Sequence, residues 1–158
     1  MQKINPCLWF DNNAEEAVNH YTSIFKNSKK GAVTHYGDNA PLPRGTILTI
    51  AFTLEGQDFL ALNGGPAFKF NESISLSVNC ETQEELDTYW NKLISAGGQP
   101  SQCGWLKDKF GLSWQIVPAV LPELISDKDP ARANRVMQSL LQMTKLDVRQ
   151  LQQAANAG

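Results

Sequence analysis

The sequence predicts an α+β fold in which a β-α-β-β-β module occurs twice, over about residues 3–63 and 73–117, followed by a helical tail over 119–158. The first observation is a pair of similar helical segments, EEAVNHY and EELDTYW, each preceded by one predicted strand and followed by several more. The second is that the sequence after Pro118 shows helical periodicity only. Because a repeated order of elements outweighs any single motif, we predict one domain over residues 1–158.

The first module begins with a strand, INPCLWF, whose alternation places Asn5, Cys7 and Trp9 on one face. Pro6 has no N–H to donate, which predicts a strand at the edge of its sheet. A helix follows, with Asn13 and Glu16 spaced as a capping box. Its apolar stripe consists of Ala14, Ala17, Val18, Tyr21, Ile24 and Phe25.

The rest of the first module is predicted to be three strands. A strand over 31–37 precedes the loop GDNAPLPRG, which is too rich in proline and glycine to be regular. Two further strands, TILTIAFTL and QDFLALN, flank Glu55–Gly56, and the glycine permits a tight hairpin there.

The second module opens with SISLSVN, in which Ser73, Ser75 and Ser77 alternate with an inward-facing set, Ile74, Leu76 and Val78. Thr82 and Glu85 form a second capping box, and Gly97–Gly98 ends that helix. A short strand near 99–103 and a hairpin, QCGWLKDKFGLSWQIVP, complete the module. Alternation directs Ser113 and Gln115 to one face of the last strand and Trp114 and Ile116 to the other. We expect Asp108 and Lys109, in the turn, to be solvated.

The tail is predicted to form short helices. Pro118 and Pro122 bracket a first segment, Asp129 precedes Pro130 as an N-cap, and Asp147 can cap a last helix. Helices of this length are marginal alone, so we expect them to pack against the sheets or against a partner subunit.

Composition narrows the functional class. Charged residues make up 19% of the chain, with 14 basic and 16 acidic side chains and no basic block, so we expect no nucleic-acid partner. No apolar run approaches the length of a membrane span, and the first residues lack the apolar core of a signal peptide. Cys7, Cys80 and Cys103 are odd in number and widely spaced, which argues against a disulfide framework. A cytoplasmic protein without membrane contact is expected.

Four stretches resemble the PhnB-like branch of the vicinal oxygen chelate (glyoxalase and bleomycin-resistance) superfamily, a branch often labelled 3-demethylubiquinone 3-methyltransferase. They are NPCLWFDNNAEEAVNHYTSIF, LALNGGP, CGWLKDKFGLSWQIVP and RVMQSLLQMTKLDVRQL. The resemblance covers essentially the whole chain, and CGWLKDKFGLSWQ is its most specific part. It implies curled mixed sheets around a cavity and a homodimer.

The resemblance also implies where metal ligands would fall, namely on Asn5, Asn63, Ser73 and Gln115. None of these is His, Asp, Glu or Cys, whereas divalent metals in proteins prefer imidazole, thiolate or carboxylate ligands. We therefore expect no metal and no cofactor. The methyltransferase label would require a glycine-rich turn opening a helix in a parallel sheet, and neither Gly64–Gly65 nor Gly97–Gly98 has that spacing.

The leading hypothesis is a metal-free protein that binds or sequesters a small molecule. The alternatives are an enzyme of the superfamily (a lyase, a dioxygenase or a cysteine-assisted enzyme), a methyltransferase as the label states, or an interaction module that uses the tail. The expected cavity residues are Asn5, Cys7, Trp9, Asn63, Ser73, Ser75, Ser77, Cys103, Trp105 and Gln115.

Each candidate also has a plainer interpretation. Cys7 and Cys103 have no predicted base beside them, which favours inert, buried thiols over nucleophiles. The tryptophans (Trp9, Trp105 and Trp114) could be core residues rather than an aromatic wall, and the serines could be solvent-exposed. Arg44 could close over an anionic ligand or simply lie on the surface.

Overall fold

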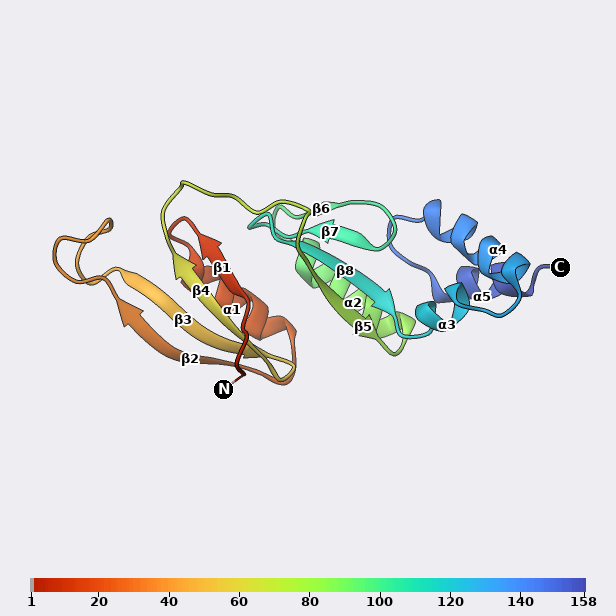
Figure 1. Ribbon diagram of the computed structural model, residues 1–158, viewed down its shortest axis with the longest axis horizontal. Coiled ribbons are helices and arrows are strands. Elements are labelled where there is room, and N and C mark those ends of the chain that lie inside the picture. The colour runs from red at the N-terminus through yellow and green to blue at the C-terminus, as the bar shows by residue number, and fades with distance from the viewer. Residues whose placement is uncertain (1) are drawn as a thin grey trace. The chain divides into compact units, whose positions relative to one another are not determined.

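The computed structural model describes residues 2–158 and contains two compact units, one up to Phe70 and the other from Asn71 to Gly158 (Figure 1). Each unit contains one four-stranded mixed sheet with a helix packed on one of its faces. The predicted α+β class and the repeated strand and helix order are confirmed. That the two units make up a single domain stays a prediction.

The first unit has the strand order β1-β4-β3-β2, in which β1 and β4 are parallel and the other neighbours antiparallel. The strand β1 lies at the edge, as Pro6 predicted, and the carbonyl of Pro6 accepts a hydrogen bond of 2.9 Å from the Leu60 N–H. The β3–β4 hairpin turns at Glu55 and Gly56, whose φ angles of 45° and 81° suit a tight hairpin. The elements are β1 (Cys7–Phe10), α1 (Ala14–Ile24), β2 (Ser28–His35), β3 (Ile47–Leu54) and β4 (Gln57–Asn63).

The core of the first unit lies between its sheet and α1. Strand alternation sends every second residue of β1, β3 and β4 toward the helix, whose own apolar stripe is buried as predicted. The buried side chains of this core include Leu8, Phe10, Ala14, Ala17, Val18, Tyr21, Ile24, Phe25, Ile50, Phe52, Leu54, Phe59 and Ala61.

The start of α1 differs from the prediction. The Asn13 side chain makes no capping hydrogen bond, so the expected capping box at this helix is wrong. Instead, Asn63 Oδ1 accepts a hydrogen bond of 2.9 Å from the Ala14 N–H, and Asn63 Nδ2 donates to the Ile47 carbonyl at 3.0 Å. A distant asparagine at the end of β4 therefore satisfies an unpaired N–H at the helix start.

The second unit has the strand order β5-β8-β7-β6, with β5 and β8 parallel. Thr82 caps its helix as predicted, since its Oγ1 accepts from the Glu85 N–H at 3.1 Å. Ile74, expected to face inward, precedes the strand and is 71% exposed. The elements are β5 (Ser75–Cys80), α2 (Gln83–Ile94), β6 (Gln99–Pro100), β7 (Trp105–Lys107), β8 (Ser113–Pro118), α3 (Leu121–Ile125), α4 (Pro130–Leu141) and α5 (Val148–Asn156).

The hairpin between β7 and β8 is organised around a buried carboxylate. Asp108 is only 3% exposed, so the expectation of a solvated side chain is wrong. Its Oδ1 accepts from the Phe110 N–H at 2.8 Å and the Leu112 N–H at 3.1 Å, and its Oδ2 accepts from Trp114 Nε1 at 2.9 Å. Three charge-assisted hydrogen bonds offset the loss of water around this carboxylate.

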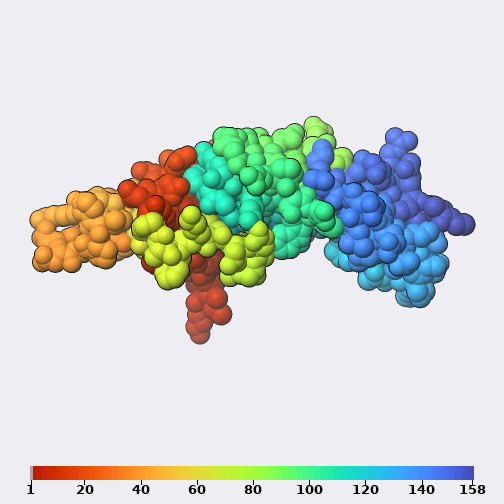
Figure 2. Space-filling view, turned by 90° about the horizontal axis from the view of Figure 1, so that it is seen from above, coloured from red at the N-terminus to blue at the C-terminus, as the bar shows by residue number. Residues whose placement is uncertain are grey.

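The tail is an integral part of the second unit. The N–H groups of Cys103 and Gly104 donate to the carbonyls of Met143 and Thr144, each at 2.8 Å. Gly104 has a φ of 84°, and a side chain there would meet Leu146 at 3.0 Å. In the space-filling view the blue tail lies directly against the green part of its own unit (Figure 2).

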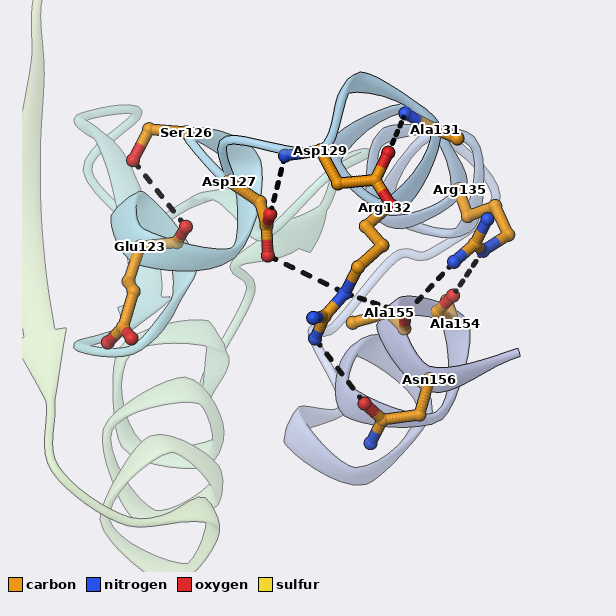
Figure 3. Close-up of polar contacts among 10 residues, drawn as sticks. All are labelled: Glu123, Ser126, Asp127, Asp129, Ala131, Arg132, Arg135, Ala154, Ala155 and Asn156. Atoms are coloured by element: carbon orange, nitrogen blue, oxygen red, sulfur yellow. Dashed lines mark hydrogen bonds and ion pairs between the residues drawn. The ribbon is translucent and has the colours of Figure 1, made fainter. Parts of the chain in front are cut away.

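Hydrogen bonds at both ends fix the tail helices. Asp129 and Asp147 cap α4 and α5 as predicted, accepting from the N–H groups of Ala131 and Gln150, each at 2.9 Å. At the other end of α5, Arg132 and Arg135 donate to carbonyls of its last turn at 3.1–3.2 Å (Figure 3). Guanidinium groups at a helix C-terminus pair its free carbonyls and complement the helix dipole. Within residues 2–158, none of the helices is both long and apolar enough to cross a membrane.

Candidate functional site

The face of the first sheet that α1 does not cover carries an apolar row across its strands. The strand register places Cys7, Leu60 and Ala51 side by side. Gly31 lies next to Ala51, and a Cβ added at Gly31 would sit 3.1 Å from the Ala51 carbonyl oxygen. Because the residues at the β2 side of this row are small, the sheet surface is hollow there.

A polar row lies beside the apolar one. The register places Asp58, Thr53 and Lys29 next to one another, and Thr53 Oγ1 donates to Asp58 Oδ1 at 3.1 Å. A hydrogen bond from the Gln2 backbone N–H, followed by the one from Thr53, lowers the pKa of the Asp58 carboxyl. This row therefore offers a fixed anion, a hydroxyl and a nearby ammonium.

The two rows form the floor of a cavity of about 550 Å³, within the range of small-molecule sites. Its position on the uncovered sheet face matches the alternation predicted for Asn5 and Cys7, which both line it. The lining residues are Asn5, Cys7, Lys29, Gly31, Ala51, Phe52, Thr53, Asp58, Phe59 and Leu60.

Trp9 lies on the same face as Cys7, and the two glycines after β4 fix its ring. A Cβ at Gly64 would lie 2.4 Å from the indole, so only glycine leaves room for it. The indole Nε1 donates to the Gly65 carbonyl at 2.9 Å, and the Phe68 ring meets Trp9 edge-on at 5.0 Å between centroids. The Gly64–Gly65–Pro66 motif is evident in the sequence, whereas its contact with the Trp9 ring is seen only in the structure.

The uncovered face of the second sheet carries a separate polar row. The register aligns Ser77, Gln115 and Trp105, and Gln115 Nε2 donates to Ser75 Oγ at 2.9 Å. Trp114 lies on the opposite, helix-covered face and is 2% exposed. The predicted alternation along this last strand is therefore confirmed.

Three other expected cavity residues lie elsewhere. Asn63 is 2% exposed on the helix side of its sheet, where α1 uses its amide, so its assignment to the cavity is corrected. Ser73 precedes β5 and is exposed, with its hydroxyl hydrogen-bonded to Asn71. Cys103 lies in a loop with a φ of 57°, held by its bond to the tail. The contacts of Asn63 and Cys103 join residues far apart in the sequence, and no local pattern indicates them.

The charged loop candidate is a surface residue. Arg44 is 75% exposed at its side chain and pairs with Asp38 at 3.2 Å. An exposed pair of this kind contributes little to stability, and neither side chain lines the cavity.

The donor set does not fit a divalent metal. Of the four positions that the resemblance assigns to ligands, Asn63 uses its amide within the fold, and Asn5, Ser73 and Gln115 offer amide and hydroxyl oxygens without charge. Among residues 2–158, no three His, Cys, Asp or Glu side chains gather in a group that could hold a metal ion.

The cysteines differ in their surroundings. Cys7 is exposed, contrary to the expected burial, yet partial desolvation raises the pKa of its thiol. Burial raises the pKa of the Cys80 thiol to about 12. A raised pKa lowers the thiolate fraction at neutral pH, and the thiolate is the nucleophile.

We therefore expect Cys7 to react with iodoacetamide more slowly than free cysteine at pH 7, and Cys80 not to react in the folded protein. The rate at Cys7 should rise with pH until pH passes its raised pKa. Mass-spectrometric mapping of the alkylated peptides at several pH values measures this. Rapid modification of Cys7 at pH 6 would contradict the expectation and indicate a depressed pKa.

The strand directions in the two sheets can be compared with those that a Rossmann-type methyltransferase requires. In each four-stranded sheet of residues 2–158, one neighbouring pair is parallel and the other two are antiparallel. The Rossmann site that S-adenosylmethionine enzymes of that type use requires a mostly parallel sheet with a glycine-rich turn, and neither sheet has this form.

Comparison with known proteins places the chain in a family. Residues 2–117 match the family described as 3-demethylubiquinone-9 3-methyltransferase. A putative 3-demethylubiquinone-9 3-methyltransferase, PhnB protein, from Bacillus cereus is 39% identical, with a TM-score of 0.68 over 75% of this chain and 100% of that one. A protein from Pseudomonas aeruginosa shares 22% identity and a TM-score of 0.60 over 75% of this chain and 98% of that one, which shows the fold alone.

No curated protein matches the chain. The family match covers most of the sequence and agrees with the PhnB-like resemblance of its motifs. The chain therefore belongs to the 3-demethylubiquinone-9 3-methyltransferase family.

Proposed function

We propose that this protein binds a small organic molecule without a metal, on the uncovered face of the first sheet. The observation that carries the proposal is the cavity of about 550 Å³ over that face, with an apolar floor and a polar row beside it. Pockets of this size, mostly apolar with a few placed polar groups, are typical ligand sites.

The lining defines the ligand class. Leu60, Ala51 and Gly31 offer a low apolar surface that suits a flat ring. Thr53 and Asp58 offer oxygens that accept hydrogen bonds, and Lys29 offers donors. The opposite charges of Lys29 and Asp58 balance, so the best fit is a neutral or weakly charged molecule with an aromatic or apolar body and one polar end.

Filling the cavity should abolish binding. We expect Ala51→Phe to occupy the floor of the cavity and to reduce the affinity for such ligands at least tenfold, because the added ring takes the place of the ligand body. The measurement is a screen of neutral aromatic amides and phenols, read by tryptophan fluorescence and thermal shift.

Ala131→Phe is the matched control, since it makes the same change at an exposed position of α4 outside the cavity. The control should bind the ligands as the unmodified chain does. If ligands that stabilise the unmodified protein bind Ala51→Phe equally well, they do not occupy this cavity and the proposal fails.

The metal-free part of the proposal has its own test. Elemental analysis of untagged protein purified from cells should find less than a tenth of an equivalent of transition metal, and native mass spectrometry of the same sample should reveal any retained organic ligand. One equivalent of zinc, nickel, iron or manganese that is lost on substitution of Gln115 would overturn it.

We also propose that the protein is a cytoplasmic homodimer. Support comes from large apolar side chains that the units leave in solvent, among them Ile4 at 87%, Phe68 at 67% and Ile74 at 71% exposure. Light scattering of the full chain should give twice the mass of 17.5 kDa, and a monomer at micromolar concentration would contradict the proposal.

A further inference from the structure

The second unit contains a smaller pocket of its own, lined by β6, β7 and the first residue of β8. Its volume of about 180 Å³ equals that of about six water molecules, at roughly 30 Å³ each. It shares no lining residue with the cavity of the first unit. The polar and aromatic residues around it are Glu72, Gln99, Trp105, Lys107 and Ser113.

Ser113 is the unusual member of this pocket. The residue is 1% exposed, and within residues 2–158 its Oγ has no hydrogen-bond partner. Alternation along β8 turns it away from the helix-covered Trp114 and toward the pocket face. Buried hydroxyls in folded proteins are nearly always paired, so this one calls for a partner that the pocket itself can hold.

Charged and polar side chains line the same pocket. Lys107 lies directly opposite Ser113 in the strand register, and its ammonium forms an ion pair with Glu72. The hydrogen bond from Lys107 lowers the pKa of the Glu72 carboxyl, which keeps it ionised. Gln99 lies opposite Lys107 on the next strand and adds an amide. The pocket thus carries one anion and one cation, with no net charge.

We propose that this pocket binds a small neutral polyol of about three carbons, with one hydroxyl paired to Ser113 Oγ. The carboxylate of Glu72 only accepts hydrogen bonds and the ammonium of Lys107 only donates them, whereas each hydroxyl of a polyol does both. Adjacent hydroxyls can therefore satisfy both charged groups at once. An anion would face Glu72 and a cation would face Lys107, each at a cost. This site is independent of the ligand proposed for the first unit.

The test is a titration of the full ¹⁵N-labelled chain with glycerol, followed by NMR. Saturable shift changes should cluster on residues 99–107 and 113, including the Trp105 indole N–H. Ser113→Ala should weaken the affinity at least fivefold, whereas Ser95→Ala, at an exposed serine of the same unit outside the pocket, should leave it unchanged. Sorbitol at matched concentration is too large to enter and should produce only small, linear shifts.

A second readout is thermal stability. Removing an unpaired buried hydroxyl should leave the melting temperature of Ser113→Ala equal to or above that of the unmodified protein. A drop of several degrees would mean that the hydroxyl already has a structural partner, and would overturn the proposal. Equal glycerol affinity in Ser113→Ala, glycerol shifts that do not saturate, or acetate or acetamide binding as tightly as glycerol would overturn it as well.

The experiments can refute the ligand cavity of the first unit and the polyol pocket of the second unit independently. Glycerol binding should be the same in Ala51→Phe as in the unmodified chain, because that substitution lies in the first unit. A protein that binds glycerol but no aromatic ligand would refute the proposed function alone, and the reverse result would refute the polyol site alone.

Discussion

Deleting residues 129–158 is expected to unfold the second unit. The deletion removes four large buried apolar side chains, Val136, Met143, Leu146 and Leu151, each worth about 1.5–3 kcal/mol. Their sum is at least about 6 kcal/mol, as large as the whole stability of many domains. The deletion also leaves the N–H groups of Cys103 and Gly104 without their carbonyl partners. Circular dichroism and thermal melting of the truncated chain measure the effect.

Point variants distinguish the contribution of buried side chains of the tail to stability from that of its exposed side chains. Leu151→Ala, at a fully buried position of α5, should cost about 2–5 kcal/mol. Leu141→Ala is the matched control, because its side chain is 50% exposed, and it should change stability by less than about 0.5 kcal/mol. A truncated chain that melts at the temperature of the full chain would show that the tail is dispensable.

Replacing Asp108 by alanine is the substitution with the largest expected effect in the hairpin. The variant would leave two backbone N–H groups and the Trp114 indole N–H without their acceptor, inside the unit. Each stranded donor costs about 1–3 kcal/mol, so we expect a loss of at least about 3 kcal/mol in the free energy of unfolding, measured by urea denaturation.

The substitution Asp108→Asn keeps the size of the side chain, so it separates the effect of lost hydrogen bonds from the effect of lost volume. Its amide oxygen can still accept from the Phe110 and Leu112 N–H groups, but its NH₂ group would face the donor of Trp114, so the loss should be intermediate. Asp38→Ala, an exposed aspartate that pairs with Arg44, is the control and should change stability little. A stability loss of less than 1 kcal/mol for Asp108→Ala would contradict the role assigned to this carboxylate.

The sequence by itself determined the architecture. The repeated strand and helix order, the edge position of β1, the hairpin at Glu55–Gly56, and the caps at Thr82, Asp129 and Asp147 all follow from local rules. Proline geometry, turn preferences and capping act within a few residues, so a single stretch of sequence contains the information. Alternation, with its period of two, also fixed the face of Gln115.

Tertiary structure decided the rest, because the deciding contacts join distant residues. Asn63 caps α1 from 49 positions away, which removes it from the cavity that its place at a strand end suggested. Asp108 is buried because the indole of Trp114 folds back onto it, and polarity alone predicted a solvated turn. The cavity exists because Gly31 and Ala51, two small residues on neighbouring strands, meet on an uncovered face. The pairing of β2 with β3 across the long loop 36–46 brings these two residues together, and no pattern within either strand specifies it.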